Sequence, residues 1–178
     1  MKIYLDICCF NRPFDDQSQL RIKLESDAKL AIQDDIRSGK HCLVWSYMLD
    51  YENQKCPFPE RRGQISKWRA YAMEDIEEDE GLINSAKLIG QTGIKKMDYL
   101  HIASAIKGNA DYFLTTDDVI LKRASLIANI KITDPIGFIA LIQRERFDYT
   151  KWRQGLDEEL SIEEISRKAM LLRKNKQA

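Results

Sequence analysis

The sequence predicts an α/β fold with a central, mostly parallel sheet that is flanked by helices. Short apolar runs that suit buried strands occur at residues 3–5, 42–45, 112–115 and 130–132. Helical patterns separate these runs, and strands that alternate with helices are typical of parallel sheets, because each crossover needs a helix. The chain has 178 residues, of which 44% are hydrophobic, so it can bury the core that such a domain needs.

A strand, a loop and a long helix are expected first. The apolar run at residues 3–5 ends at Asp6, and Pro13 with its acidic neighbours marks residues 11–16 as a loop. A helical pattern follows and ends at Gly39, because glycine frequently terminates helices. The apolar stripe expected for this helix consists of Leu20, Leu24, Ala28, Ala31 and Ile32.

The middle of the chain is expected to contain the second strand and three helices. Ser46 follows this strand and is well placed to cap a helix that carries Glu52. Residues 60–89 are interpreted as two helices that are separated near the acidic run at 77–80. The expected remainder is a helix over 97–107, a strand over 112–115, a helical segment over 118–127, a strand over 130–132 and a helix that begins at Pro135.

The composition limits the class of protein. The 28 basic and 28 acidic residues give a formal net charge of zero. Proteins that package nucleic acid are usually strongly basic, so any nucleic acid is expected to bind at a local surface. The four cysteines form no C-x-x-C pair, and the N-terminal residues do not resemble a signal peptide. No apolar run approaches the roughly 20 residues of a membrane span. We therefore expect a reduced, cytoplasmic protein without a membrane segment.

Four acidic residues are expected near the carboxyl ends of the strands, where ligands bind in open α/β sheets. Asp6 and Asp117 each follow a strand, Asp98 lies at the start of a helix, and Glu52 lies on the helix after the second strand. Clustered carboxylates repel one another, so such a site normally holds a cation. Oxygen ligands favour Mg²⁺ or Mn²⁺, which activate water and stabilise the charge that develops in phosphodiester hydrolysis.

Each of these acids also has an ordinary explanation. Asp98 and Asp117 suit helix caps, with Asp118 as an alternative cap for the second of these helices. Glu52 suits a solvated helix face. Asp6 is harder to explain in this way, because the segment around it is otherwise apolar. Spacing alone leaves both interpretations open.

The residues around the acids resemble the motifs of the PIN-domain family. The similarity lies in residues 4–8 and 11–16, in the D-x-x-H-I-A motif that begins at Asp98, and in the T-x-D motif that ends at Asp117. The family also has a serine or threonine followed by a glutamate on the next helix. Ser46 and Glu52 fit that pattern, and Asp50 is an alternative to Glu52.

The resemblance extends over residues 1–144, and we expect a PIN domain over residues 1–146. Residues 147–178 are the expected C-terminal helical extension, in which Ser161 and Glu164 fit a capping box. That helix has an apolar stripe, which suggests packing on the domain or on a second subunit. Because PIN domains commonly self-associate, a homodimer is one expected assembly.

PIN domains are metal-dependent nucleases, and their short bacterial and archaeal members are mostly VapC-type toxins of toxin–antitoxin pairs. The resemblance therefore implies a Mg²⁺- or Mn²⁺-dependent endoribonuclease that cuts single-stranded RNA segments and binds a small cognate antitoxin. The implied catalytic residues are Asp6, Glu52, Asp98 and Asp117, and the implied metal ligands are Asp6, Asp98 and Asp117. Further expected roles are hydrogen bonding to a carboxylate for Thr115 and Thr116, and contact with substrate phosphate for Asn11 and Arg12.

Two other functions are considered. A catalytically silent PIN-like module would bind RNA or a protein, but it has no need of clustered carboxylates. A phosphatase with an aspartyl nucleophile at Asp6 would resemble the haloacid-dehalogenase class, which places a second acid where this chain has Cys8. His101 is expected to pack between its helix and the sheet, with one ring nitrogen hydrogen-bonded.

Overall fold

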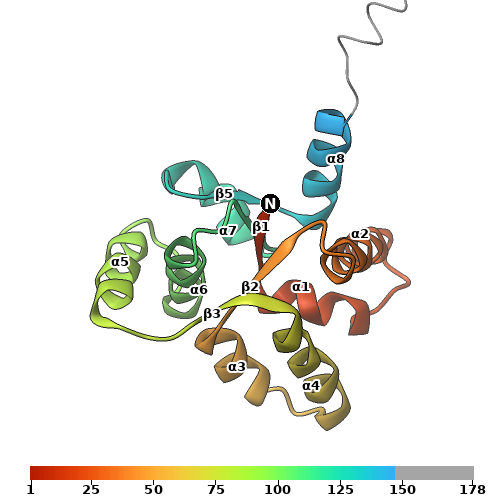
Figure 1. Cartoon of the computed structure of the whole chain (residues 1–178), viewed down its shortest axis with the longest axis horizontal. Helices are drawn as coiled ribbons and strands as arrows, with labels where there is room; N and C mark the ends of the chain where they lie inside the picture. The colour runs from red at the N-terminus through yellow and green to blue at the C-terminus, as the bar shows by residue number, and fades with distance from the viewer. Residues whose placement is uncertain (147–178) are drawn as a thin grey trace, which may run out of the picture. The chain divides into compact units, whose positions relative to one another are not determined.

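A computed structural model describes residues 1–146 of the chain (Figure 1). The strands are β1 (Lys2–Leu5), β2 (Cys42–Ser46), β3 (Ala72–Ile76), β4 (Tyr112–Leu114) and β5 (Lys131–Thr133). The α-helices are α1 (Ile7–Asn11), α2 (Leu20–Arg37), α3 (Tyr47–Gln54), α4 (Pro59–Ser66), α5 (Glu80–Gly90), α6 (Lys96–Lys107), α7 (Asp118–Arg123) and α8 (Pro135–Arg146). Short 3-10 helices cover η1 (Arg12–Phe14), η2 (Lys67–Tyr71) and η3 (Ala124–Leu126).

Residues 1–140 form the compact unit that contains the sheet. The predicted C-terminal extension, residues 147–178, lies outside the residues that the structure describes, so that part of the domain assignment stays a prediction. In the part of the chain from residue 1 to residue 146, no helix is long and apolar enough to cross a membrane.

The sheet is five-stranded, with the order β3-β2-β1-β4-β5, and every pair of neighbouring strands is parallel. This confirms the predicted α/β class. Helix α6 packs on β2 and β4, with α5 against α6, while α2 lies on the other side of the sheet (Figure 1). From the central strand β1 the chain continues to β2 and β3 on one side, and it later reaches β4 and β5 on the other. The gap between β1 and β4 is therefore the topological switch point, where α/β sheets bind their ligands.

The central strands are buried on both faces. Ile3, Tyr4 and Leu5 of β1 are fully buried, as are Phe113 and Leu114 of β4. Parallel strands with helices on both faces give continuous apolar runs of this kind, because no side of the strand faces water. The sequence predicted β1, β2, β4 and β5 from this signal, to within one residue at their boundaries.

The strand β3 was not predicted, and the assignment of residues 60–89 to two helices was wrong. The structure places α4, η2, β3 and α5 in the segment 59–90. β3 is an edge strand that pairs with β2 alone, and its residues alternate in exposure, with Met73 64% exposed. Such short, polar edge strands lack the apolar run that identifies a buried strand.

Two local predictions near the N-terminus also need correction. The segment 11–16 was expected to be a loop, but α1 begins directly after Asp6 and η1 follows it. In α2 the predicted apolar stripe was wrong at its N-terminal end, since Leu20 and Leu24 are 71% and 47% exposed, whereas Ile32 is buried as predicted. The buried residues of α2 are Glu25, Ser26, Lys29, Ile32, Gln33 and Ile36. Burial of so many polar groups requires partners from other elements, which the pattern of one helix does not reveal.

Candidate active site

The carboxyl ends of β1 and β4 bring two of the predicted acids to the switch point. Leu5 and Leu114 are paired in register, and the Asp6 amide donates to the Leu114 carbonyl at 2.9 Å. Asp6 therefore lies beside the C-terminal end of β4. The segment that leads from β4 to Asp117 consequently runs beside Asp6, and the interaction of Thr115 with the Asp6 carboxylate follows from this register.

The Asp6 carboxylate is held by both of its oxygens. Asp6 is 6% exposed and is the N-cap of α1, where Oδ1 accepts the Ile7 N–H at 2.7 Å. The Thr115 hydroxyl donates to Oδ2 at 2.7 Å, and the Cys8 thiol lies 3.1 Å from the same oxygen. These contacts fix the orientation of the carboxylate. Cys8 is thus a polar neighbour of Asp6.

The two threonines after β4 differ in their contacts. Thr115 Oγ1 donates to Asp6 and also accepts the Asp117 N–H at 3.1 Å, so it links the two acids as a carboxylate-orienting hydroxyl was expected to do. Thr116 is also buried, but its Oγ1 has no hydrogen-bond partner among residues 1–146. Its backbone N–H instead donates to Cys8 Sγ at 3.2 Å.

Asp117 is the N-cap of α7. Its Oδ1 accepts the backbone N–H groups of Val119 at 2.6 Å and Ile120 at 3.3 Å. Asp118, the alternative cap, is exposed and pairs instead with Arg21 at 2.6 Å. The ordinary capping explanation therefore applies to Asp117, although the described capping bonds use only one of its two oxygens.

Asp98 has no capping role. The N-cap of α6 is Lys95, and Asp98 Oδ2 is a buried oxygen without a hydrogen-bond donor among the described residues. Burial, together with the negative charges of Asp6, Asp117 and, more weakly, Glu52, raises the pKa of Asp98 to about 6, while His101 opposes this shift. The structure therefore brings all four predicted acids into one electrostatic environment.

Glu52 is connected to the sheet through His101. Its Oε2 lies 3.0 Å from His101 Nε2, while His101 Nδ1 lies 2.7 Å from the Tyr4 hydroxyl. The Tyr4 hydroxyl also contacts Ser46 Oγ at 2.6 Å. Ser46 occupies the N-cap position of α3 but makes no capping bond with its side chain, contrary to expectation. Sequence reasoning missed Tyr4; its only signal is a hydroxyl in an otherwise apolar strand.

The two residues predicted to contact substrate phosphate have different surroundings. The Arg12 guanidinium pairs with the buried Glu25 at 2.8 Å and with Asp15 at 3.2 Å, so it is engaged within the protein. Asn11 lines a hollow of about 350 Å³ together with Glu52 and Lys55, which we call the Glu52 hollow. Asn11 Oδ1 is buried and has no partner in the described part of the chain.

The four acids present carboxylate oxygens, the ligands that Mg²⁺ and Mn²⁺ prefer. The unpaired Asp98 Oδ2 and the charges that raise the pKa of Asp98 are features that a bound cation would relieve. Within residues 1–146, no three His, Cys, Asp or Glu side chains already have the geometry of a metal site. The chemistry of the donor set thus fits a hard cation, while the described side-chain positions do not form a finished coordination sphere.

The parallel sheet in this strand order, with acids around the switch point, defines an α/β protein with a PIN-like fold. No family model matches the sequence, and no curated protein matches it either. Similar solved structures include FitAcB from Neisseria gonorrhoeae, which has a TM-score of 0.50 and 13% identity over 75% of this chain and 97% of that chain.

Two further structures are similar over most of their length. VapBC-1 from nontypeable Haemophilus influenzae has a TM-score of 0.49 and 15% identity over 76% of this chain and 98% of that chain. VapBC2 from Rickettsia felis, bound to a DNA fragment from its promoter, has a TM-score of 0.47 and 16% identity over 75% and 98%. At sequence identities this low, structural similarity indicates a shared fold and nothing more. The similarity to FitAcB agrees with the PIN-like α/β fold that the motifs implied.

Proposed function

We propose that this protein is a metal-dependent endoribonuclease that hydrolyses RNA phosphodiester bonds. The observation that carries the proposal is the convergence of Asp98 with Asp6, Glu52 and Asp117 at the switch point of the sheet. An unpaired, buried carboxylate oxygen beside other carboxylates is unfavourable without a cation. A divalent cation and a phosphodiester substrate provide a reason for such an arrangement.

Asp6, Asp98 and Asp117 are the residues that would hold Mg²⁺ or Mn²⁺. Such an ion supplies an activated water and stabilises the negative charge that develops on the phosphoryl oxygens. The protein's own contribution is orientation. Thr115 and the N-terminus of α1 hold the Asp6 carboxylate in place, so that it does not have to be ordered during the reaction.

Glu52 is proposed to orient the attacking water. Its Oε2 accepts the His101 hydrogen bond, which fixes the carboxylate, while Oε1 has no hydrogen-bond partner among residues 1–146 and is available to water. His101 is held in turn by Tyr4, so the orientation of Glu52 is set by the core of the sheet. In-line attack by this water would leave a 5′-phosphate and a 3′-hydroxyl.

The Glu52 hollow supports a single-stranded RNA substrate. Lys55, Phe58 and Arg61 line it beside Glu52, and Phe58 is 57% exposed. Cationic side chains next to an exposed ring suit a strand whose phosphates and unpaired bases are both accessible. Asn11 also lines this hollow, so contact between Asn11 and the substrate is part of the proposal.

We further propose that the nuclease is the toxin of a toxin–antitoxin pair and is neutralised by a small cognate antitoxin. This part rests on the resemblance of the motifs at Asp6, Asp98 and Asp117 to those of VapC-type proteins. All four cysteines are free, which suits the reduced cytoplasm as the place of action. Self-association into a homodimer is part of the same proposal.

One specific observation favours the alternative, a catalytically silent module that binds RNA or a protein. Asp6 and Asp117 already accept backbone N–H groups at the starts of α1 and α7, so a structural role accounts for part of their chemistry. In that case neither metal nor cleavage is expected. Asp98 discriminates between the two functions, because no capping role explains it.

The test is cleavage of a mixed pool of structured and unstructured RNAs in Mg²⁺, in Mn²⁺ and in EDTA. The wild type is compared with Asp98→Asn and with Glu60→Gln, a matched control at an exposed acid in α4. Binding of Mn²⁺ is measured separately by calorimetry. Metal-dependent cleavage that is lost in Asp98→Asn and kept in Glu60→Gln supports the nuclease. If neither cleavage nor Mn²⁺ binding occurs, the silent module is the better description.

A further inference from the structure

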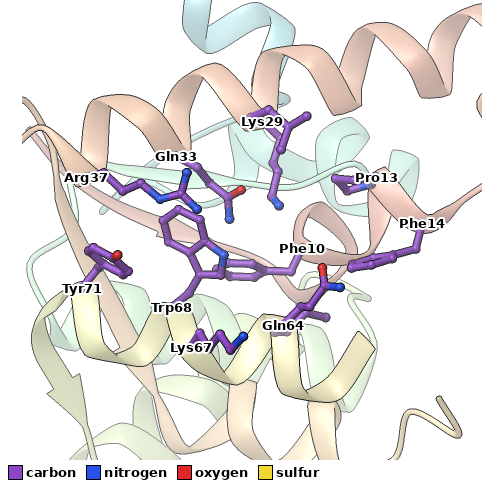
Figure 2. Close-up of a pocket in the computed structure, with 12 residues that line it drawn as sticks. Phe10, Pro13, Phe14, Lys29, Gln33, Arg37, Gln64, Lys67, Trp68 and Tyr71 are labelled. Carbon is purple, nitrogen blue, oxygen red and sulfur yellow. The ribbon is translucent and has the colours of Figure 1, made fainter. Parts of the chain in front are cut away.

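A second pocket lies between α2 and the segment formed by α4 and η2 (Figure 2). It has a volume of about 600 Å³, within the range of small-molecule sites. None of the four acids of the candidate active site lines it. We call it the α2 pocket and define it by Phe10, Lys29, Gln33, Arg37, Trp68 and Tyr71.

One wall of the α2 pocket carries hydrogen-bond donors. Lys29, Gln33 and Arg37 are spaced by four residues on α2, so they lie on one face of the helix, and Figure 2 shows all three side chains extending from α2 toward Trp68 and Phe10. Lys67 adds a further cation from η2. Among the described residues that line the pocket, none is acidic. The pocket is therefore a cationic cavity in a chain whose net charge is zero.

Lys29 is a buried cation without a counterion. The residue is only 4% exposed, and no ion pair or hydrogen bond joins its ammonium to another residue between 1 and 146. Its nitrogen lies 5.4 Å from the centre of the Phe10 ring, a contact that compensates only part of the lost hydration. Burial lowers the pKa of Lys29 to about 8. Proteins rarely bury an ammonium group unless it is paired.

Gln33 is a second buried donor without an acceptor. The residue is 3% exposed, and Nε2 has no hydrogen-bond partner in the described part of the chain. Figure 2 shows its amide on the same side of α2 as the Lys29 ammonium. A buried N–H group that lacks an acceptor is unfavourable, because it has lost its hydrogen bond to water. Two such donors that face one cavity indicate a ligand with several anionic oxygens.

The opposite wall is aromatic. Trp68 is 7% exposed, and the Arg37 guanidinium lies 4.5 Å from the centre of its ring. The Tyr71 ring is centred 5.2 Å from that of Trp68 and is tilted by 39°, and Tyr71 remains 49% exposed. A flat group that enters the pocket can therefore stack on the open part of Tyr71, and it would be bordered by Arg37. Stacking of this kind suits a nucleobase, since every base has a π-face.

We propose that the α2 pocket binds a nucleoside monophosphate, with its phosphate at Lys29 and Gln33 and its base against Tyr71. A phosphate presents more oxygens than a carboxylate does to the several N–H groups of the Lys29 ammonium and the Gln33 amide. The volume of the pocket exceeds what an inorganic anion fills, and its aromatic wall would stay unused by one. This site is independent of the proposed nuclease, because none of its residues belongs to the acidic cluster.

The test is calorimetric titration of the full-length protein with AMP, GMP, CMP and UMP in EDTA. The same titration uses adenosine and inorganic phosphate as separate probes. Lys29→Met keeps the apolar stem and removes the charge, so the variant is expected to fold. Lys23→Met removes an exposed lysine from the same helix and serves as the control. We expect Lys29→Met to weaken nucleotide binding at least tenfold, Gln33→Leu and Tyr71→Ala to weaken it several-fold, and Lys23→Met to leave it unchanged.

Several results would overturn the proposal. Inorganic phosphate that binds as tightly as the nucleotides would show a simple anion site without base recognition. Binding of a hexaglutamate peptide, with none of the nucleotides, would indicate an acidic protein partner instead. Equal affinity in wild type and Lys29→Met would remove the pocket from consideration, and so would the absence of binding by every nucleotide. Asp98→Asn should bind the nucleotides as the wild type does, which separates this site from the candidate active site.

Discussion

His101 Nε2 lies 3.0 Å from Glu52 Oε2, and His101 Nδ1 lies 2.7 Å from the Tyr4 hydroxyl. In the tautomer whose Nε2–H donates a hydrogen bond to Glu52, Nδ1 accepts the hydrogen bond of the Tyr4 hydroxyl, and the Tyr4 oxygen accepts that of Ser46 at 2.6 Å. The sequence predicted a packed histidine with one bonded nitrogen, whereas both nitrogens are bonded. The histidine therefore couples the position of Glu52 to strand β1.

Tyr4→Phe is expected to lower the free energy of unfolding by about 1–3 kcal/mol, because it leaves the buried His101 Nδ1 and Ser46 Oγ without a partner. Urea denaturation measures the change. Tyr51→Phe is the control, since Tyr51 is 48% exposed and its ring contact with Lys55 does not need the hydroxyl. If the two variants lose the same amount of stability, the hydroxyl chain through Tyr4 has no special role.

Thr115→Val and Thr116→Val form a matched pair of buried, isosteric substitutions. The first removes the hydroxyl that donates to Asp6 and accepts from Asp117, so a loss of about 1–3 kcal/mol is expected. The second removes a hydroxyl without a partner among the described residues, so it should be neutral or slightly stabilising.

The same pair tests the orientation of the Asp6 carboxylate. Thr115→Val should reduce Mn²⁺ affinity on the order of tenfold, as loss of a hydrogen bond to a metal ligand does, and Thr116→Val should not. Calorimetry with Mn²⁺ is the measurement. Equal effects of the two substitutions would contradict the assignment of that role to Thr115.

The Asp98 carboxyl is expected to destabilise the metal-free protein as the pH rises. Its pKa is 3.8 in the reference state and about 6 in the folded protein, first because of burial and then because of the nearby carboxylates. The folded state thus binds this proton more tightly than the unfolded state. The resulting loss of stability begins above about pH 4 and is complete above about pH 6.

Asp98→Asn is therefore expected to be more stable than the wild type near neutral pH in EDTA, by about 1 kcal/mol after allowance for solvent screening of a half-buried group. At about pH 4 that advantage should disappear, because the wild-type carboxyl is then largely protonated in the folded state. Urea denaturation at both pH values checks this, with Glu60→Gln as the control. An advantage of the same size at both pH values would contradict it.

Arg12→Ala is expected to lower the free energy of unfolding by about 2–4 kcal/mol, because it removes one of the two partners of a buried carboxylate. Glu25 is 2% exposed and pairs with Arg12 and Arg21, each at 2.8 Å. Arg21 is more exposed, at 55%, so Arg21→Ala should have a smaller effect. The double variant Arg12→Ala with Glu25→Gln should recover part of the loss.

The same variant separates a structural Arg12 from one that contacts substrate. If Arg12→Ala keeps its stability but loses RNA affinity, its guanidinium binds phosphate as the sequence suggested. If stability falls and the RNA affinity of the folded fraction is unchanged, its role is to hold η1 against α2. Urea denaturation and RNA binding by fluorescence anisotropy measure the two quantities.

The sequence by itself determined the parallel α/β class, four of the strands and the order of the acids. These features are local, because a buried parallel strand needs an unbroken apolar run and the acids directly follow or begin their elements. Asp6 and Asp117 could therefore be placed at one edge of the sheet before its strand order was known. The motif resemblance added Glu52, which spacing alone described equally well as a solvated charge.

Only the tertiary structure decided which polar groups are buried and what they contact. The buried face of α2 contains Glu25, Lys29 and Gln33, because Arg12 reaches Glu25 from η1 while Lys29 and Gln33 face the α2 pocket. The hydrogen bond between Tyr4 and His101 joins residues that are 97 positions apart. A sequence pattern reports the average polarity of a helix face or strand, whereas the free energy of a buried polar group depends on the one partner that meets it.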